Sequence, residues 1–179
     1  MANNQEYMQN TIQGIMVRKS NEFVSGKYKS SLLENKLMAF ALTRLRIVNG
    51  CPVADMYKND IINILGCKEN NIYRKLKRTA ADMSGHVICL EDGRGNFQCF
   101  SMVTNASYVN GIFTIQFNQE MAPYVSGLKQ NFTTYELAAL ARFEYNHSYR
   151  LYELLKKEIY KSNPQVNNGV VEKTFGVNE

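Results

Sequence analysis

The sequence predicts an α+β fold, because the spacing of its apolar residues changes from helical to alternating along the chain. Two stretches of helical period, residues 58–65 and 70–83, are separated only by a short turn that contains glycine. An alternating stretch with two turn signals follows, between residues 87 and 117. Two closely joined helices followed by antiparallel strands predict a winged helix, and later helical stretches predict additional C-terminal helices.

A long first helix is predicted ahead of this unit. Ser31 and Glu34 fit a capping box, in which each side chain accepts a hydrogen bond from the other residue's backbone N–H. Apolar residues then recur at helical spacing as far as Val48, where Asn49 and Gly50 interrupt the pattern. We therefore expect one core helix from Ser31 to Val48.

Each helix of the predicted helix-turn-helix has one apolar side. In the shorter helix, residues 58–65, this side ends at Leu65, and Gly66 is a natural C-terminal stop. The longer helix, residues 70–83, keeps the helical spacing as far as Met83. So short a connection between two helices is typical of a helix-turn-helix.

Three antiparallel strands are predicted after the helix-turn-helix. Residues 87–90 alternate, and residues 91–96 form a polar turn rich in glycine. Residues 97–109 are expected to form one long strand. The Asn-Gly pair at 110–111 is the strongest hairpin signal in the chain, and residues 113–117 alternate in the returning strand.

Helices are expected again toward the C-terminus. The first covers residues 118–128, where the early position of Pro123 is compatible with a helix. A second helix is expected to start at Thr133 or Thr134, with Glu136 in its first turn. The last helix begins near Asn146 and is expected to pack on the first helix.

The domain organisation follows from these patterns. Residues 1–14 are expected to form a flexible arm, and residues 15–161 the winged-helix domain, whose first segment, 15–23, could be a short edge strand. Residues 162–179 contain proline, glycine and asparagine and then an apolar segment, so they predict a linker and the start of a second winged helix that is not completed.

The composition favours a folded protein with a polyanionic partner. Hydrophobic residues make up 45% and charged residues 21%, which argues against extensive disorder. The net charge of +5 and the pI near 9.0 favour polyanionic partners without identifying them. The longest apolar run, residues 37–42, is too short to span a bilayer, so no membrane partner is expected.

Neither a cofactor, a metal site nor an enzyme activity is expected. The two histidines, His86 and His147, do not form a ligand pair, and no nucleophile, phosphate-binding or zinc-protease motif occurs. Tyr108 or Tyr135 could be imagined as a nucleophile for DNA cleavage, but such a nuclease would also need metal-binding histidines close together, and the sequence offers no such pair. The cysteines form no CxxC pair, so we expect reduced, mostly buried thiols in a cytoplasmic protein. They are Cys51, Cys67, Cys89 and Cys99.

The longer helix of the helix-turn-helix has a basic face that predicts contact with DNA. At about 100° per residue its polar residues project away from its core residues. No acidic residue occurs in this helix before Asp82, which is unusual for a face that merely keeps a helix solvated. The expected DNA-binding residues are Asn71, Arg74, Lys75 and Arg78, with Lys77 on the flank. Contact with phosphates and reading of bases both remain open.

Two other charged positions have competing interpretations. Arg94 lies in the polar turn, where it could reach a flanking groove of DNA or simply keep the turn soluble. Arg150 and Glu153 are three residues apart in the last predicted helix, and a local ion pair is favoured there over ligand binding.

Several strings of the sequence resemble the first domain of plasmid replication initiator (Rep) proteins, in the same order and with the same spacing. The resemblance covers about residues 17–160. The strings are Asn71-Ile72-Tyr73-Arg74-Lys75-Leu76-Lys77, Phe113-Thr114-Ile115-Gln116-Phe117-Asn118, Ala122-Pro123-Tyr124, Leu128-Lys129, Phe132-Thr133 and Arg150-Leu151-Tyr152-Glu153-Leu154-Leu155.

This resemblance implies a protein of two winged helices that binds repeated sites, called iterons, in double-stranded origin DNA. It also implies a homodimer formed largely through the first domain, and contacts with host replication proteins such as an initiator or a helicase. The sequence stops at Glu179, where a second winged helix would begin, so contact with the DNA backbone and dimerisation carry over most directly. Two alternatives stay open: a winged-helix transcriptional regulator, and a dimerisation module with little DNA affinity of its own.

Overall fold

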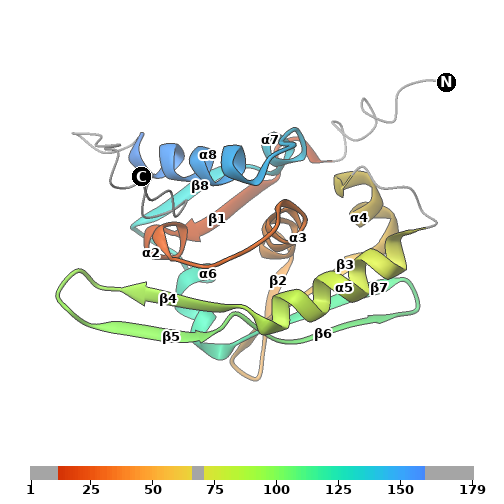
Figure 1. The fold of residues 1–179 in the computed structure, drawn as a ribbon, viewed down its shortest axis with the longest axis horizontal. Helices are drawn as coiled ribbons and strands as arrows, with labels where there is room; N and C mark the ends of the chain where they lie inside the picture. The colour runs from red at the N-terminus through yellow and green to blue at the C-terminus, as the bar shows by residue number, and fades with distance from the viewer. Residues whose placement is uncertain (1–11, 66–70, 160–179) are drawn as a thin grey trace, which may run out of the picture.

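A buried helix lies at the centre of the molecule, between a four-stranded antiparallel sheet and a two-stranded ribbon. A computed structural model describes residues 12–65 and 71–159. Figure 1 shows the central helix α3 (Leu32–Leu42) with the sheet on one side and the ribbon of β1 and β8, covered by α8, on the other. In spatial order the sheet contains β2 (Leu45–Val48), β3 (Cys51–Tyr57), β7 (Ile112–Phe117) and β6 (Val103–Val109). The α+β class and the winged-helix fold are therefore confirmed.

Helix α3 is shorter than the sequence predicts. Its capping box forms between Ser31 and Glu34 as expected, but the helix ends at Leu42. The next residues form β2 instead, which pairs with β3 through a tight turn where Asn49 and Gly50 have φ of 50° and 80°. The prediction of one helix to Val48 is wrong, because these residues favour a two-residue hairpin turn and only coincidentally continue the helical spacing.

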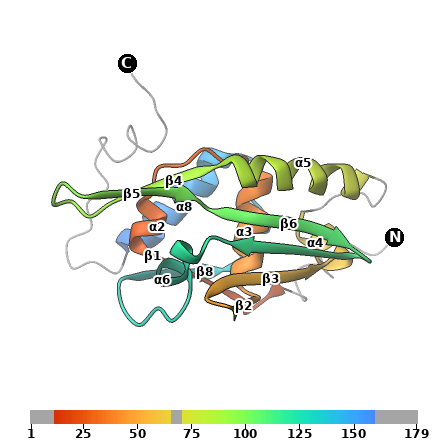
Figure 2. The same cartoon turned by 90° about the horizontal axis from the view of Figure 1, so that it is seen from below.

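The two helices of the helix-turn-helix form where the sequence predicts them. They are α4 (Lys58–Leu65) and α5 (Ile72–Gly85). The turn between them, residues 66–70, lies outside the described residues. Helix α5 contacts the edge strand β6 along its side, so it is fixed against the sheet (Figure 2).

The predicted long strand over residues 97–109 is in fact two strands in different sheets. Strand β5 (Phe97–Ser101) pairs with β4 (Val87–Glu91), whereas β6 pairs with β7. The chain crosses between the sheets at Met102, which is buried and whose backbone N–H donates to the carbonyl of His86 at 3.2 Å. Because a buried residue fixes this crossing, alternation along the sequence could not locate it.

The hairpin of β6 and β7 occupies the place of the wing. It pairs through β7 with β3, the strand that leads into α4, and its turn has the predicted Asn110-Gly111 pair with φ of 49° and 81°. The backbone N–H of Lys58, at the start of α4, donates to the carbonyl of Gly111 at 2.8 Å. The β4–β5 ribbon is an additional hairpin at the other end of α5 (Figure 1).

The C-terminal part contains two further corrections, because the helix expected over residues 118–128 is only a 3-10 turn followed by a short helix that ends at Val125. Residues 132–136 form strand β8, which pairs with β1 (Met16–Ser20), so the helix expected from Thr133 or Thr134 is wrong. Thr133 and Tyr135 alternate into the core, as a half-buried strand requires. The remaining elements are α2 (Asn21–Ser25), η2 (Gln119–Met121), α6 (Ala122–Val125), α7 (Leu137–Ala141) and α8 (Asn146–Glu158).

Helix α8 begins at Asn146 as predicted, but the side chain of this residue does not cap the helix. Its Nδ2 donates to the carbonyl of Ser30 at 2.8 Å, and its Oδ1 accepts from the side chain of Asn35 in α3 at 2.7 Å. The predicted contact between the last helix and α3 is thus present. Helix α8 packs mainly on β8, however.

A buried ionic network anchors α8. The predicted ion pair of Arg150 and Glu153 forms at 2.8 Å, and Lys19 of β1 adds a second, unpredicted pair with Glu153 at 2.6 Å. Burial alone would raise the pKa of Glu153, but Lys19 and Arg150 hold it below its ordinary value. Tyr135 and Tyr149 also donate to this carboxylate. The network therefore links β1, β8 and α8 through the buried carboxylate of Glu153.

The cysteine prediction is wrong for two of the four residues. Cys89 and Cys99 face each other across the β4–β5 ribbon and form a disulfide, with their Cα atoms 4.2 Å apart. Cys51 is a free, half-buried thiol, and Cys67 lies outside the described residues. Pairing depends on the register of two strands, which the spacing of cysteines does not reveal.

Most of the predicted terminal segments lie outside the described residues. Of the expected arm, only residues 12–14 are described, and Ile12 is buried. The expected linker and second domain, residues 162–179, are not described. The predicted edge strand over residues 15–23 corresponds to β1 followed by α2, which Ser20 caps through its hydroxyl.

Candidate nucleic-acid interface

Helix α5 presents a continuous basic face. Its apolar side is buried at Ile72, Leu76 and Met83. The opposite side is exposed, and so are all five predicted residues, four within the helix and one, the N-cap residue, directly before it. They are Asn71, Arg74, Lys75, Lys77 and Arg78. The helical period thus brings these five side chains together, as the sequence predicts.

Three cations of this face, Arg74, Lys77 and Arg78, are weakly neutralised within the described part of the chain. Nε of Arg78 lies 3.7 Å from the carboxylate of Asp82, one turn along the helix, but the two side chains are 87% and 52% exposed. An ion pair so exposed contributes little. Arg74 donates to the side chain of Asn71 at 3.4 Å, and Lys77 has no ionic partner within the described part of the chain. An external anion can therefore compete for these groups.

Arg94 lies apart from this face. It sits in the turn between β4 and β5, and in Figures 1 and 2 this turn is at one end of the molecule while α5 extends toward the other. Asp92 organises the turn by accepting from the backbone N–H of Arg94 at 2.7 Å and from the side chain of Asn96 at 2.6 Å. The Asn96 bond is the main reason why the pKa of Asp92 is lowered. The structure does not bring Arg94 to the basic face.

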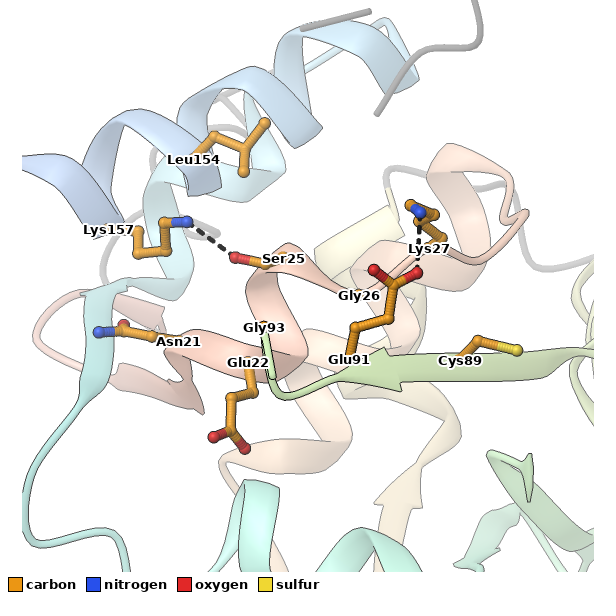
Figure 3. Close-up of a pocket in the computed structure, with 10 residues that line it drawn as sticks. All are labelled: Asn21, Glu22, Ser25, Gly26, Lys27, Cys89, Glu91, Gly93, Leu154 and Lys157. Atoms are coloured by element: carbon orange, nitrogen blue, oxygen red, sulfur yellow. Dashed lines mark hydrogen bonds and ion pairs between the residues drawn. The ribbon is translucent and has the colours of Figure 1, made fainter. Parts of the chain in front are cut away.

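A cleft of about 440 Å³ between α2, β4 and α8 is a second candidate site (Figure 3). Two lysines line it, but both are already bonded: Lys27 to Glu91 at 2.9 Å, and Lys157 to Ser25 at 2.7 Å. The carboxylates of Glu22 and Glu91 also line the cleft. Phosphates would meet carboxylates here, so this cleft suits a polyanion less well than the face of α5 does.

The described residues contain no arrangement for metal binding. Within 12–65 and 71–159, no group of three or more His, Cys, Asp or Glu side chains is placed to hold a metal ion. Tyr135, considered above as a nucleophile, is fully buried, and burial together with Glu153 raises its pKa well above the ordinary value. No helix in the same ranges is both long and apolar enough to cross a bilayer.

Sequence reasoning missed one group of residues next to α5. Phe113 and Phe117 of β7 are buried, but Tyr108 of the neighbouring strand β6 is not. The ring of Tyr108 is partly exposed and meets the ring of Tyr73 edge to face, with centroids 5.9 Å apart. No sequence signal reports this contact, because it depends on how α5 lies against the sheet.

Together these features define a winged-helix domain with a basic second helix of its helix-turn-helix. The chain belongs to a family of replication initiators: the sequence model of "Initiator Replication protein, WH1" matches residues 16–156. This confirms the resemblance found in the sequence.

Two proteins are similar to this chain in sequence or in fold. An uncharacterized 27.6 kDa protein of Escherichia coli is 25% identical over 157 residues, which cover 79% of this chain and 66% of that protein. The chain thus spans just under two thirds of the length of this relative. The fold is also that of the Pi initiator protein, solved in complex with iteron DNA, with a TM-score of 0.67 and 18% identity over 89% of this chain and 71% of that one.

Proposed function

We propose that this chain is the N-terminal domain of a plasmid replication initiator and binds double-stranded origin DNA at iterons, mainly through phosphates. The observation that carries this proposal is the exposed face of α5, which has four cations and a single carboxylate. Family membership and the fold shared with the Pi initiator, whose structure was solved with iteron DNA, support it.

Binding by such a face is mainly electrostatic. Each cation that approaches a phosphate releases counterions from the duplex, so the affinity falls as salt rises. Arg74 and Arg78 can each hold a phosphate through two parallel hydrogen bonds, whereas Lys75 and Lys77 act as point charges. Such binding involves no covalent chemistry. It positions a larger protein on DNA.

The experiment compares two double variants that each lose two positive charges, one on the basic face of α5 and one elsewhere on the surface. Arg74→Ala/Arg78→Ala should reduce the slope of log K against log salt by about 1.8 units in anisotropy titrations with a short duplex. Lys129→Ala/Arg142→Ala removes two exposed cations from the loop before β8 and from the end of α7, and its slope should match wild type. Equal slopes for all three proteins would contradict the assignment. Arg94→Ala tests whether the β4–β5 turn adds a separate contact.

The proposal also includes a homodimer and, for the whole protein, contacts with host replication proteins. Strand β2 is an edge of the sheet and exposes Ile47 and Val48, which supports docking of a second copy. Light scattering at high micromolar concentration tests this. A strictly monomeric chain would contradict the dimer without affecting the DNA-binding proposal.

A further inference from the structure

A groove of about 320 Å³ runs between α5 and β6, directly beside the basic face. Its floor is apolar, with Leu76 of α5 and Phe113 of β7. Lys77 belongs both to the rim of the groove and to the basic face. The groove follows α5 from Tyr73 to Ser84, a length of about 16 Å at the helical rise per residue. No carboxylate lines it, in contrast to the cleft in Figure 3.

Three hydroxyl donors in this groove are unused. Among the residues that the structure describes, the hydroxyls of Tyr73, Ser107 and Tyr108 have no hydrogen-bond partner. Two neighbouring hydroxyls differ, because Ser84 donates to the carbonyl of Ala80 at 2.9 Å and Thr104 to that of Gln116 at 3.2 Å. The rings of Tyr73 and Tyr108 meet edge to face, a favourable aromatic contact that places their two hydroxyls in the same groove.

We propose that this groove binds the sugar–phosphate backbone of one DNA strand, beside the stretch held by the basic face. The hydroxyls of Tyr73, Ser107 and Tyr108 donate to phosphate oxygens, and Lys77 bridges the two surfaces. This inference rests on the proposed function and extends the contact from α5 to the sheet. Hydroxyl groups commonly bind phosphates in protein–DNA complexes, and the apolar floor suits the C–H surface of the sugars.

The test uses the different salt dependence of charged and neutral contacts. Tyr73→Phe, Ser107→Ala and Tyr108→Phe each remove one oxygen and should weaken duplex binding about threefold to tenfold. Their salt slopes should equal that of wild type, because no cation is lost. Lys77→Ala should lower both the affinity and the slope, the latter by about 0.9. Unchanged melting temperatures show that the variants remain folded.

Thr104→Val is the matched control, because the Thr104 hydroxyl lies outside the groove and is already bonded within the chain. This variant should bind like wild type. If the triple variant Tyr73→Phe/Ser107→Ala/Tyr108→Phe binds as tightly as wild type while Arg74→Ala/Arg78→Ala weakens binding, the groove assignment is wrong and the proposed function survives. If neither the triple variant nor Arg74→Ala/Arg78→Ala changes the affinity, the groove assignment and the proposed function are both wrong.

A second experiment locates the contact on the DNA. Duplexes that carry one neutral methylphosphonate at successive positions are titrated with wild type and with Tyr108→Phe. At the phosphate that Tyr108 contacts, the loss of affinity from the methylphosphonate and the loss from Tyr108→Phe should be less than additive. At every other phosphate the two losses of affinity should add. Additive losses at every position would overturn the proposal.

Discussion

Asp82 is the residue through which the proposed interface can be tested by a gain of affinity, because it is the only carboxylate on α5. The carboxylate of Asp82 lies 3.7 Å from Nε of Arg78, so it would also lie close to any phosphate that Arg78 holds. Two negative charges roughly 8 Å apart in water repel each other by about 0.5 kcal/mol. Since Asp82 and Arg78 are both exposed, water is the appropriate medium. Asp82→Asn should therefore raise the affinity for duplex DNA about twofold.

The assay is fluorescence anisotropy with a short duplex at about 50 mM and about 200 mM salt. The gain should shrink at the higher salt, because screening at about 0.15 M acts over roughly 8 Å. Glu144→Gln is the control, since it removes the same charge from an exposed position between α7 and α8. An unchanged or lower affinity for Asp82→Asn, or an equal gain for Glu144→Gln, would show that Asp82 does not lie beside bound DNA.

Three further predictions concern stability. Glu153→Gln leaves the buried Lys19 ammonium without its anion and should lower the free energy of unfolding in urea by about 3–5 kcal/mol. The pKa of Glu153 is lowered in the fold, so its contribution to the stability of the fold is complete above the ordinary carboxyl pKa and is lost as the pH falls through the lowered value. The Glu153→Gln variant lacks this contribution and should therefore lose less stability in acid than wild type. Cys99→Ser should cost about 2–3 kcal/mol against oxidised wild type in thermal unfolding, and no more than a few tenths against the reduced protein. Gly26→Ala should cost about 1–3 kcal/mol, because its Cβ would lie 2.8 Å from Cδ1 of the buried Ile88; an unchanged melting temperature would contradict this packing.

The elements that the sequence predicts correctly are those with local signals. Helices α4 and α5 have one apolar side each, and Asn110-Gly111 favours its turn regardless of the rest of the fold. Strand β2 was missed because Leu45 and Val48 fit a helical spacing as well as a strand. Strand β8 was missed because its partner is remote in the sequence, with Met16 paired to Glu136.

The residues of the site likewise differ in whether a local sequence pattern predicts their position. The basic face of α5 depends only on the helical period, so its five residues could be predicted. The groove depends on the approach of Tyr108 to Tyr73, which tertiary packing decides. The position of Arg94 depends on the crossing at Met102, which separates the β4–β5 ribbon from the wing. Neither the groove nor the crossing has a local sequence pattern.

Contact of duplex DNA with the basic face of α5 can be mapped residue by residue. The most direct measurement is a map of backbone amide shifts in the ¹⁵N-labelled chain during titration with a short origin duplex. We expect the largest changes in residues 72–85 of α5 and 103–109 of β6, with β4, β5 and the cleft beside α8 unaffected. Changes centred on the β4–β5 ribbon or on that cleft, with α5 unchanged, would contradict this expectation.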